Sequence, residues 1–205
     1  MRAAYRSLEP CCLLSPLPVV MVSVGASGRK PNIFTAAWCG TVNSQPPMIS
    51  VSIRKERYSH AFVTESREFV VNLAAKEQCR DLDFCGVKSG REIDKFQHLH
   101  LEPLSMPHMD WAPGISGVPA SLGCKVRHTL PLGSHDLFIG EVVDVQVRED
   151  LFDSEDALHL ERAGLVCYTH GLYQQVSDIL GFFGYSVAKP DVLRKRMERY
   201  RGQQR

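Results

Sequence analysis

Apolar residues in short alternating or β-branched runs dominate the chain and predict a strand-rich fold. One run shows the alternation clearly, because Val143, Val145 and Val147 would share one strand face while Asp144 and Gln146 take the other. By the same criterion, strands are expected at residues 19–24, 32–38, 48–53, 69–73, 122–130, 137–147 and 164–173. Helical periodicity and capping residues predict helices at residues 59–66, 77–86 and 190–204.

Turn-forming residues separate these elements. The tetrapeptide Gly25-Ala26-Ser27-Gly28 predicts a hairpin turn, an irregular loop is expected at residues 39–47, and Ser59 is the expected N-cap of the first helix. Residues 98–119 carry four prolines and two glycines and predict a long functional surface loop. Because strands and helices do not alternate regularly, the pattern predicts a mainly β, antiparallel barrel with peripheral helices. We expect residues 1–205 to form one domain, with its core at about residues 16–190.

Composition and charge exclude few classes of protein. The 205 residues have a formal net charge of +1, so no global field would attract nucleic acid or an anionic membrane. The seven cysteines lack C-x-x-C spacing and predict reduced thiols in a cytoplasmic protein. The apolar run at residues 11–24 follows Arg2 and Arg6, as in a signal peptide. Since Pro16 and Pro18 interrupt it, we interpret it as a proline-led strand.

Familiar catalytic and binding motifs fit the sequence poorly. No helical pattern follows the first glycine-rich turn, so the dinucleotide fingerprint is not matched, and the sequence has no P-loop or G-x-S-x-G elbow. His98, His100 and His108 lack acidic or cysteine partners at ligand spacing, so no metal site is expected. Basic residues at positions 194–201 lie beside an apolar stripe, which favours a docked helix with a solvated basic face over a nucleic-acid site.

A cluster of cationic and phenolic side chains after residues 48–53 predicts an anion site. Arg54, Lys55, Arg57 and Tyr58 crowd against Ser59. A strand end with solubilising charges would have the same composition. However, like charges placed together cost free energy unless an anion or carboxylates offset them, and the first amides of the following helix could bind the same anion.

The neighbouring strand ends in residues suited to a flat ring. Thr35, Ala36 and Ala37 are small enough for a planar ligand to approach the backbone, and Trp38 offers an indole face. A flat aromatic head with a phosphate tail is the outline of FMN.

Several segments of the chain also look familiar in their order. They are Lys30-Pro31-Asn32, Thr35-Ala36-Ala37-Trp38, Pro46-Pro47, Ser52-Ile53-Arg54-Lys55, Arg57-Tyr58-Ser59, Phe69-Val70-Val71-Asn72, Ser89-Gly90, Asp94-Lys95-Phe96, Gly140-Glu141-Val142 and Phe183-Gly184-Tyr185-Ser186. From about Pro18 to Pro190, the chain resembles the flavin reductase-like family with an FMN-binding split barrel, and within it the flavoredoxin-type branch.

The resemblance implies a Greek-key split β-barrel that forms a homodimer with one FMN per subunit. The residues implied to line the isoalloxazine ring are Thr35, Ala36, Ala37 and Trp38. Those implied at the ribityl chain and phosphate are Ser52, Arg54, Lys55, Arg57, Tyr58 and Ser59, with Ser89 and Lys95 approaching from a neighbouring loop. His135 lies in a Gly-Ser-His turn that resembles the family's Gly-Asp-His motif, with Ser134 in place of the acid, and would contact a nicotinamide donor. Lys95 is also a candidate for the cation that stabilises reduced flavin. No catalytic side chain is required, because the cofactor supplies the chemistry.

Two functions remain open. One is an NAD(P)H-dependent flavin reductase that passes electrons through FMN to a flavin or protein acceptor. The other is an electron carrier with tightly bound FMN, reduced by a protein donor, and the loop at residues 98–119 could favour it by covering the free face of the flavin. A barrel that has lost its flavin is a third reading, against which the intact cationic cluster argues.

Overall fold

The computed structural model describes residues 3–202, so the last two positions of the expected helix at residues 190–204 lie outside the described residues. The strands are β1 (Leu17–Pro18), β2 (Val20–Ala26), β3 (Arg29–Ala36), β4 (Cys39–Ser44), β5 (Pro47–Arg54), β6 (Glu68–Leu73), β7 (Pro103–Leu104), β8 (Gly114–Ile115), β9 (Ala120–Pro131), β10 (His135–Val147), β11 (Val166–Thr169) and β12 (Leu172–Gln175). The helices are α1 (Tyr58–Ser66), α2 (Cys79–Val87), α3 (Lys95–His98) and α4 (Pro190–Gly202), with short 3₁₀ turns between some of these elements.

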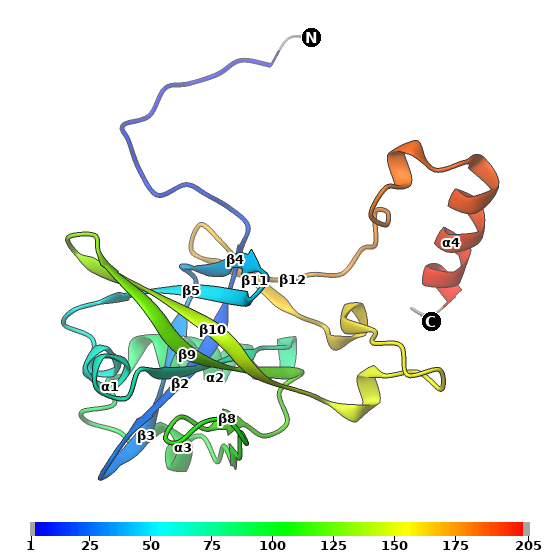
Figure 1. Ribbon diagram of the computed structural model, residues 1–205. Helices are drawn as coiled ribbons and strands as arrows, with labels where there is room; N and C mark the ends of the chain where they lie inside the picture. Colours follow the sequence, from blue (N-terminus) through cyan, green and yellow to red (C-terminus); the bar gives the residue numbers. More distant parts are fainter. Residues whose placement is uncertain (1–2, 203–205) are drawn as a thin grey trace.

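One large sheet forms the body of the molecule. Its strand order is β3-β2-β6-β9-β10-β5-β4, and every strand pair within residues 3–202 is antiparallel. The two ends of this sheet lie close together, because only Ala37 and Trp38 join β3, at one end of the strand order, to β4 at the other end. Figure 1 shows the helices outside these strands. The mainly β, antiparallel split barrel with few helices is therefore confirmed.

Two apolar clusters position the elements around the later site. Inside the barrel, Val22, Phe69 and Phe138 are almost completely buried, and each such side chain stabilises the fold by about 1.5–3 kcal/mol through burial. A second cluster lies between β2, β3 and α2 and buries Leu82 and Cys85, the two residues expected on one helix face. This second cluster fixes α2 against the end of β3.

Two expected elements differ from the structure. The expected loop at residues 39–47 contains strand β4, whose exposed polar side chains hide it from a hydrophobicity pattern while its backbone pairs with β5. The expected strand at residues 164–173 is instead a hairpin of β11 and β12. Its turn at His170 and Gly171 has φ values of 43° and 92°, a conformation that reverses the chain.

Ser59 is not the N-cap that the sequence predicts. Helix α1 already begins at Tyr58, Arg57 occupies the capping position without a side-chain cap, and Ser59 is buried in the first turn. The Ser59 hydroxyl instead accepts a hydrogen bond from Asn32 Nδ2 at 2.8 Å. A contact between distant segments has therefore replaced the local cap.

The segment at residues 98–119 is packed more tightly than a free surface loop. It contains β7 and β8 and buries Met106, Ala112 and Ile115. Buried Glu68 on β6 accepts hydrogen bonds from the backbone amides of Asp110, Trp111 and Ala112. This carboxylate ties the segment to the barrel.

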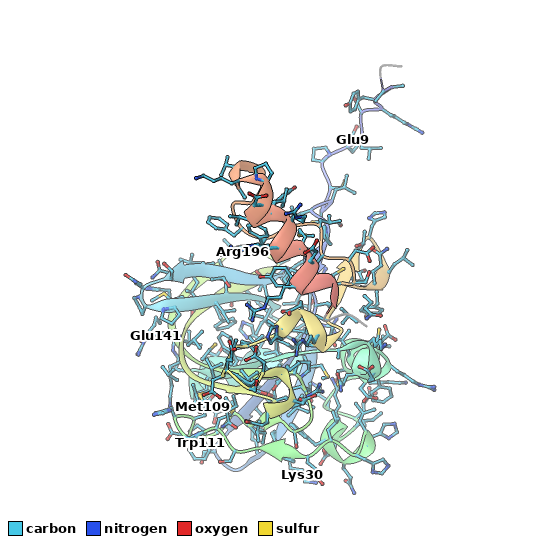
Figure 2. All side chains as sticks on the ribbon, turned by 90° about the vertical axis from the view of Figure 1, so that its right-hand side faces the viewer. Glu9, Lys30, Met109, Trp111, Glu141 and Arg196 are labelled. Carbon is cyan, nitrogen blue, oxygen red and sulfur yellow. The ribbon has the colours of Figure 1, made fainter. Side chains whose placement is uncertain are left out.

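Both terminal segments extend away from the strands. Figures 1 and 2 show the chain around Glu9 and helix α4 beyond the body of the barrel. In the C-terminal segment, the Arg196 guanidinium lies 4.8 Å from the centre of the Phe182 ring. Helix α4 is therefore not docked on the barrel, contrary to expectation. Within residues 3–202, no helix has the length and apolar character needed to cross a bilayer.

Candidate functional site

Two adjoining cavities bring together most of the residues singled out from the sequence. The first, here the ring cavity, has a volume of about 380 Å³, and the second, here the cation cavity, about 460 Å³. Phe34, Arg54 and Arg57 line both, so the two cavities lie side by side. The expected residues in the ring cavity are Thr35, Ala36, Ala37, Trp38, Ser52, Arg54, Arg57 and His135. Those in the cation cavity are Arg54, Arg57, Tyr58, Ser59, Ser89 and Lys95.

The pairing of β5 with β10 builds one wall of the ring cavity. Arg54 is the register partner of His135, which brings the end of β5 beside the start of β10. The His135 and Trp38 rings lie 4.6 Å apart at 54°, and Ser134 Oγ is 2.9 Å from His135 Nδ1. Desolvation and the nearby Arg54 charge lower the pKa of His135, which favours the uncharged form of the imidazole.

Strand β3 and helix α2 form the floor of the ring cavity. The Thr35 hydroxyl donates to the Leu82 carbonyl in α2. Gly86 sits so close that an added Cβ would be 3.2 Å from Thr35 Cβ. Since its hydroxyl is already used, Thr35 offers a ligand its backbone and methyl group rather than a free donor. This fits a flat ring better than a strongly polar ligand.

A second aromatic wall was not expected from the sequence. Tyr168 and Tyr173, on β11 and β12, line the ring cavity with their rings 5.7 Å apart. The Tyr173 hydroxyl donates to Asp83 Oδ1 at 3.0 Å. Desolvation and the Asp83 carboxylate raise the pKa of Tyr173 to about 12. The aromatic character of the β11–β12 hairpin was the available signal, but only the fold brings it to the cavity.

The cation cavity has a closely fitted wall around Ser59. An added Cβ at Gly90 would be 2.2 Å from Asn32 Oδ1, so only glycine allows this approach of the loop to β3. Asn32 in turn donates to Ser59 Oγ, which leaves the Ser59 proton to be donated to a ligand. Tyr58 and Ser59 are the first residues of α1, and a helix N-terminus favours an anion.

Lys95 is a buried cation in the same cavity. Its side chain is only 2% exposed, and Nζ donates to the carbonyls of Ile33 at 2.6 Å and Cys85 at 2.8 Å. An ammonium group has three donors, so one N–H is left for a ligand. Burial lowers the pKa of Lys95 to about 8, and the Arg57 charge adds to the fall. Lys95 lines the cation cavity and not the ring cavity.

Among the residues expected at the anion site, Lys55 is the one that lines neither cavity. Its Nζ is 3.5 Å from Asp136 Oδ1, an ion pair too long to satisfy that buried oxygen as a hydrogen bond. The other Asp136 oxygen is 2.8 Å from His60 Nε2. Hydrogen bonding from His60, followed by the charge of Lys55, lowers the pKa of Asp136. Lys55 therefore belongs to a neighbouring polar group.

The segment at residues 98–119 does not cover the ring cavity. None of its residues lines that cavity within the described part of the chain. Figure 1 shows β8 and α3 at the end of the barrel opposite β4 and β11, and Figure 2 shows Met109 and Trp111 at the end opposite α4. The Glu68 contacts hold the segment there, so the expected cover over a flavin is not supported.

Comparison with known proteins is consistent with this site. The model of the flavin reductase like domain matches residues 14–177. The flavoredoxin of Desulfovibrio vulgaris (Miyazaki F) is 30% identical with a TM-score of 0.83, over 90% of this chain and 100% of that chain. The FMN-binding protein from Thermus thermophilus, solved with bound 1-cyclohex-2-enone, is 27% identical with a TM-score of 0.72, over 88% of this chain and 99% of that chain.

Among curated sequences, FMN reductase (NADH) RutF of Stutzerimonas stutzeri is 28% identical over 145 residues, which cover 68% of this chain and 74% of that protein. Because the family model spans most of the residues, the chain belongs to the flavin reductase-like family, and its fold is that of the split-barrel flavoproteins.

Proposed function

We propose that the protein is an FMN-dependent oxidoreductase that passes electrons from NAD(P)H through FMN to a flavin or protein acceptor. The observation that carries the proposal is that the two cavities lie side by side and share Arg54 and Arg57 in their walls. One cavity has small, flat and aromatic walls, and the other has cations and hydroxyls. The named activities of an FMN reductase and a flavoredoxin among the relatives support the same class.

The residues present fit FMN. The backbone of Thr35 to Ala37 would face the isoalloxazine ring, with Trp38 beside it and Ser52 near the start of the ribityl chain. The phosphate would lie among Arg54, Arg57, Ser59, Ser89 and Lys95, listed here as the donors of the cation cavity. Bound FMN supplies hydride and single-electron transfer. The protein orients the ring, shields one face and holds the phosphate, and no side chain need transfer a proton.

An open ring cavity favours a nicotinamide donor over a purely protein donor. The 98–119 segment leaves it uncovered, and the His135 ring beside Trp38 offers a flat polar edge for a second ring. The second candidate remains an electron carrier reduced by a protein, which the similarity to flavoredoxin favours. The donor decides between them.

The same proposal includes a homodimer. Leu14, Leu180, Phe183 and Val187 on the terminal segments are strongly exposed, and single soluble chains rarely leave such a group of large apolar side chains uncovered. A second copy of the chain would cover them. Light scattering after gel filtration should give twice the chain mass, and a monomer at micromolar concentration would contradict this part of the proposal.

The central experiment is a visible spectrum of the purified protein, followed by anaerobic addition of NADH or NADPH. We expect FMN absorbance at about 450 nm, and loss of this absorbance when one of the two donors is added. Yellow protein that neither donor bleaches would favour the electron carrier. Protein that neither contains nor takes up FMN would refute both.

A variant tests the phosphate assignment. Arg54→Ala should weaken FMN binding by about tenfold and riboflavin binding much less, because only FMN carries the phosphate. Arg127→Ala is the matched control, since Arg127 pairs with Glu141 and lines neither cavity. Equal losses for the two ligands would remove Arg54 from the phosphate site.

A further inference from the structure

The cation cavity carries more positive charge than one phosphate needs. Its lining includes five cationic side chains and a single carboxylate, Glu56. The cations are Arg54, Arg57, Lys88, Arg91 and Lys95. The phosphate of FMN brings roughly two negative charges at neutral pH. After FMN has bound, about two positive charges would remain unbalanced.

The excess charge lies on two residues outside the cluster at positions 54–59, Lys88 and Arg91. Lys88 and Arg91 flank Ser89 and Gly90, and neither has a carboxylate within ion-pairing distance among the described residues. Arg91 is nevertheless held in place. Its Nη1 donates to the Glu56 carbonyl at 3.3 Å, and its guanidinium lies 5.5 Å from the centre of the Tyr58 ring. A fixed guanidinium at a cavity wall loses less conformational entropy when it binds a ligand.

The other three cations, Arg54, Arg57 and Lys95, are either bound to backbone carbonyls or border the ring cavity. Lys95 is buried and keeps one donor for a ligand, while Arg57 donates to the Gly86 carbonyl at 3.2 Å. Arg54 and Arg57 border the ring cavity, so they and Lys95 suit a phosphate attached to a ligand in that cavity. Lys88 and Arg91 are exposed and line the cation cavity without bordering the ring cavity, so they are left for a second anion.

We propose that Lys88 and Arg91 form a second anion subsite that binds the diphosphate of a dinucleotide beside the FMN phosphate. A diphosphate diester carries about one negative charge on each phosphate, which balances the remaining positive charge. The inference rests on the proposed function, since a nicotinamide ring in the ring cavity would leave its diphosphate near the adjoining cation cavity. FAD is the other source of the same chemistry.

The test uses the double variant Lys88→Gln/Arg91→Gln. The matched control is Lys76→Gln/Arg127→Gln, which removes the same charge outside both cavities. FMN-loaded protein is titrated with ADP-ribose, and flavin-stripped protein is titrated with riboflavin, FMN and FAD. The double variant should weaken ADP-ribose binding by about tenfold or more and FMN binding by less than about threefold, because charge-assisted contacts to the diphosphate are lost.

The outcomes separate the two proposals. A loss for FAD without a loss for ADP-ribose would support the diphosphate subsite and identify FAD as its ligand. Equal losses of affinity for FMN and ADP-ribose, or no loss for either ADP-ribose or FAD, would overturn the diphosphate subsite. Neither result would contradict the proposal that the protein binds FMN. A natural protein that binds no flavin at all would refute the proposed function itself.

Discussion

The buried ammonium of Lys95 should make FMN binding depend on pH in a range where most proteins are insensitive. Burial lowers the pKa of Lys95 to about 8 in the protein without ligand. The protonated form can donate its remaining N–H to the FMN phosphate, and the neutral form contributes no charge. FMN affinity should therefore be highest near pH 7, where both Lys95 and the phosphate are mostly charged, and fall as pH rises through 8.

The size of the effect follows from the titration. At pH 9, one unit above the pKa, about a tenth of the side chains keep the proton. If the Lys95 charge contributes about tenfold to binding, FMN affinity should fall about fivefold from its value at pH 7. Lys95→Met should lower FMN affinity at pH 7 by about tenfold, because it removes a charged hydrogen bond. The variant should then show little further change up to pH 9.

Quenching of flavin fluorescence between pH 6.5 and 9.5 measures both affinities, with riboflavin as the ligand control. Riboflavin has the same ring without the phosphate, so its affinity should stay nearly level in both proteins. It also reports folding, since Lys95→Met leaves the carbonyls of Ile33 and Cys85 without their buried donor. FMN affinity that is flat to pH 9 in the natural protein, or equally pH-dependent in the variant, would refute the reasoning.

Three further substitutions test the walls of the site and its support. Gly90→Ala should cost about 1–3 kcal/mol of stability and weaken FMN binding, because the new Cβ would meet Asn32 Oδ1 at 2.2 Å, as chemical denaturation and titration would show. Glu68→Gln should lower the free energy of unfolding by about 3 kcal/mol without changing FMN affinity, since it breaks a buried charged network away from the cavities. His135→Ala should raise the KM for NADH more than it lowers flavin affinity and should alter Trp38 fluorescence.

Each of these has a control in the chain. Gly40→Ala adds a Cβ with no atom within 4 Å and should leave stability unchanged, so an equal loss there would remove the argument for Gly90. For Glu68→Gln, a fall in FMN affinity would show that the 98–119 segment reaches the site after all. For His135→Ala, the assay is made in a Trp111→Phe background so that Trp38 alone reports, and an unchanged KM would exclude His135 from the donor site.

The strands could be predicted where side-chain alternation decides burial. β2 and β5 each put apolar residues on the barrel side, and the sequence shows this directly. In β10 the barrel side instead takes Phe138 and Val142, whereas Val145 is 55% exposed beyond an irregularity in the pairing with β9. β4 could not be found in this way, because it is an edge strand held by backbone pairing rather than by apolar side chains. The hairpin of β11 and β12 was missed because a positive φ at His170 is not evident from residue type alone.

Only part of the candidate site could be predicted from the sequence, because only residues close in sequence stay together whatever the packing. Local runs such as Thr35 to Trp38 stay together in the fold and were found. Asp83 lies on α2, Arg91 in the loop after α2, and Tyr173 on β12. These residues reach the cavities only because their segments pack against β3 and α1. No spacing rule within the sequence connects these segments, so their contribution needed the structure.

The difference between Arg54 and Lys55 follows from the geometry of β5. Neighbouring residues in a strand point to opposite faces, so Arg54 and Lys55 leave the end of β5 in different directions. Arg54 lies opposite His135 and lines both cavities, whereas Lys55 is drawn to Asp136. A shift of one residue in the pairing of β5 would exchange the two cations and expose Ile53, which is now 2% exposed. Burial of Ile53 thus sets the register that gives Arg54 its place at the proposed phosphate site.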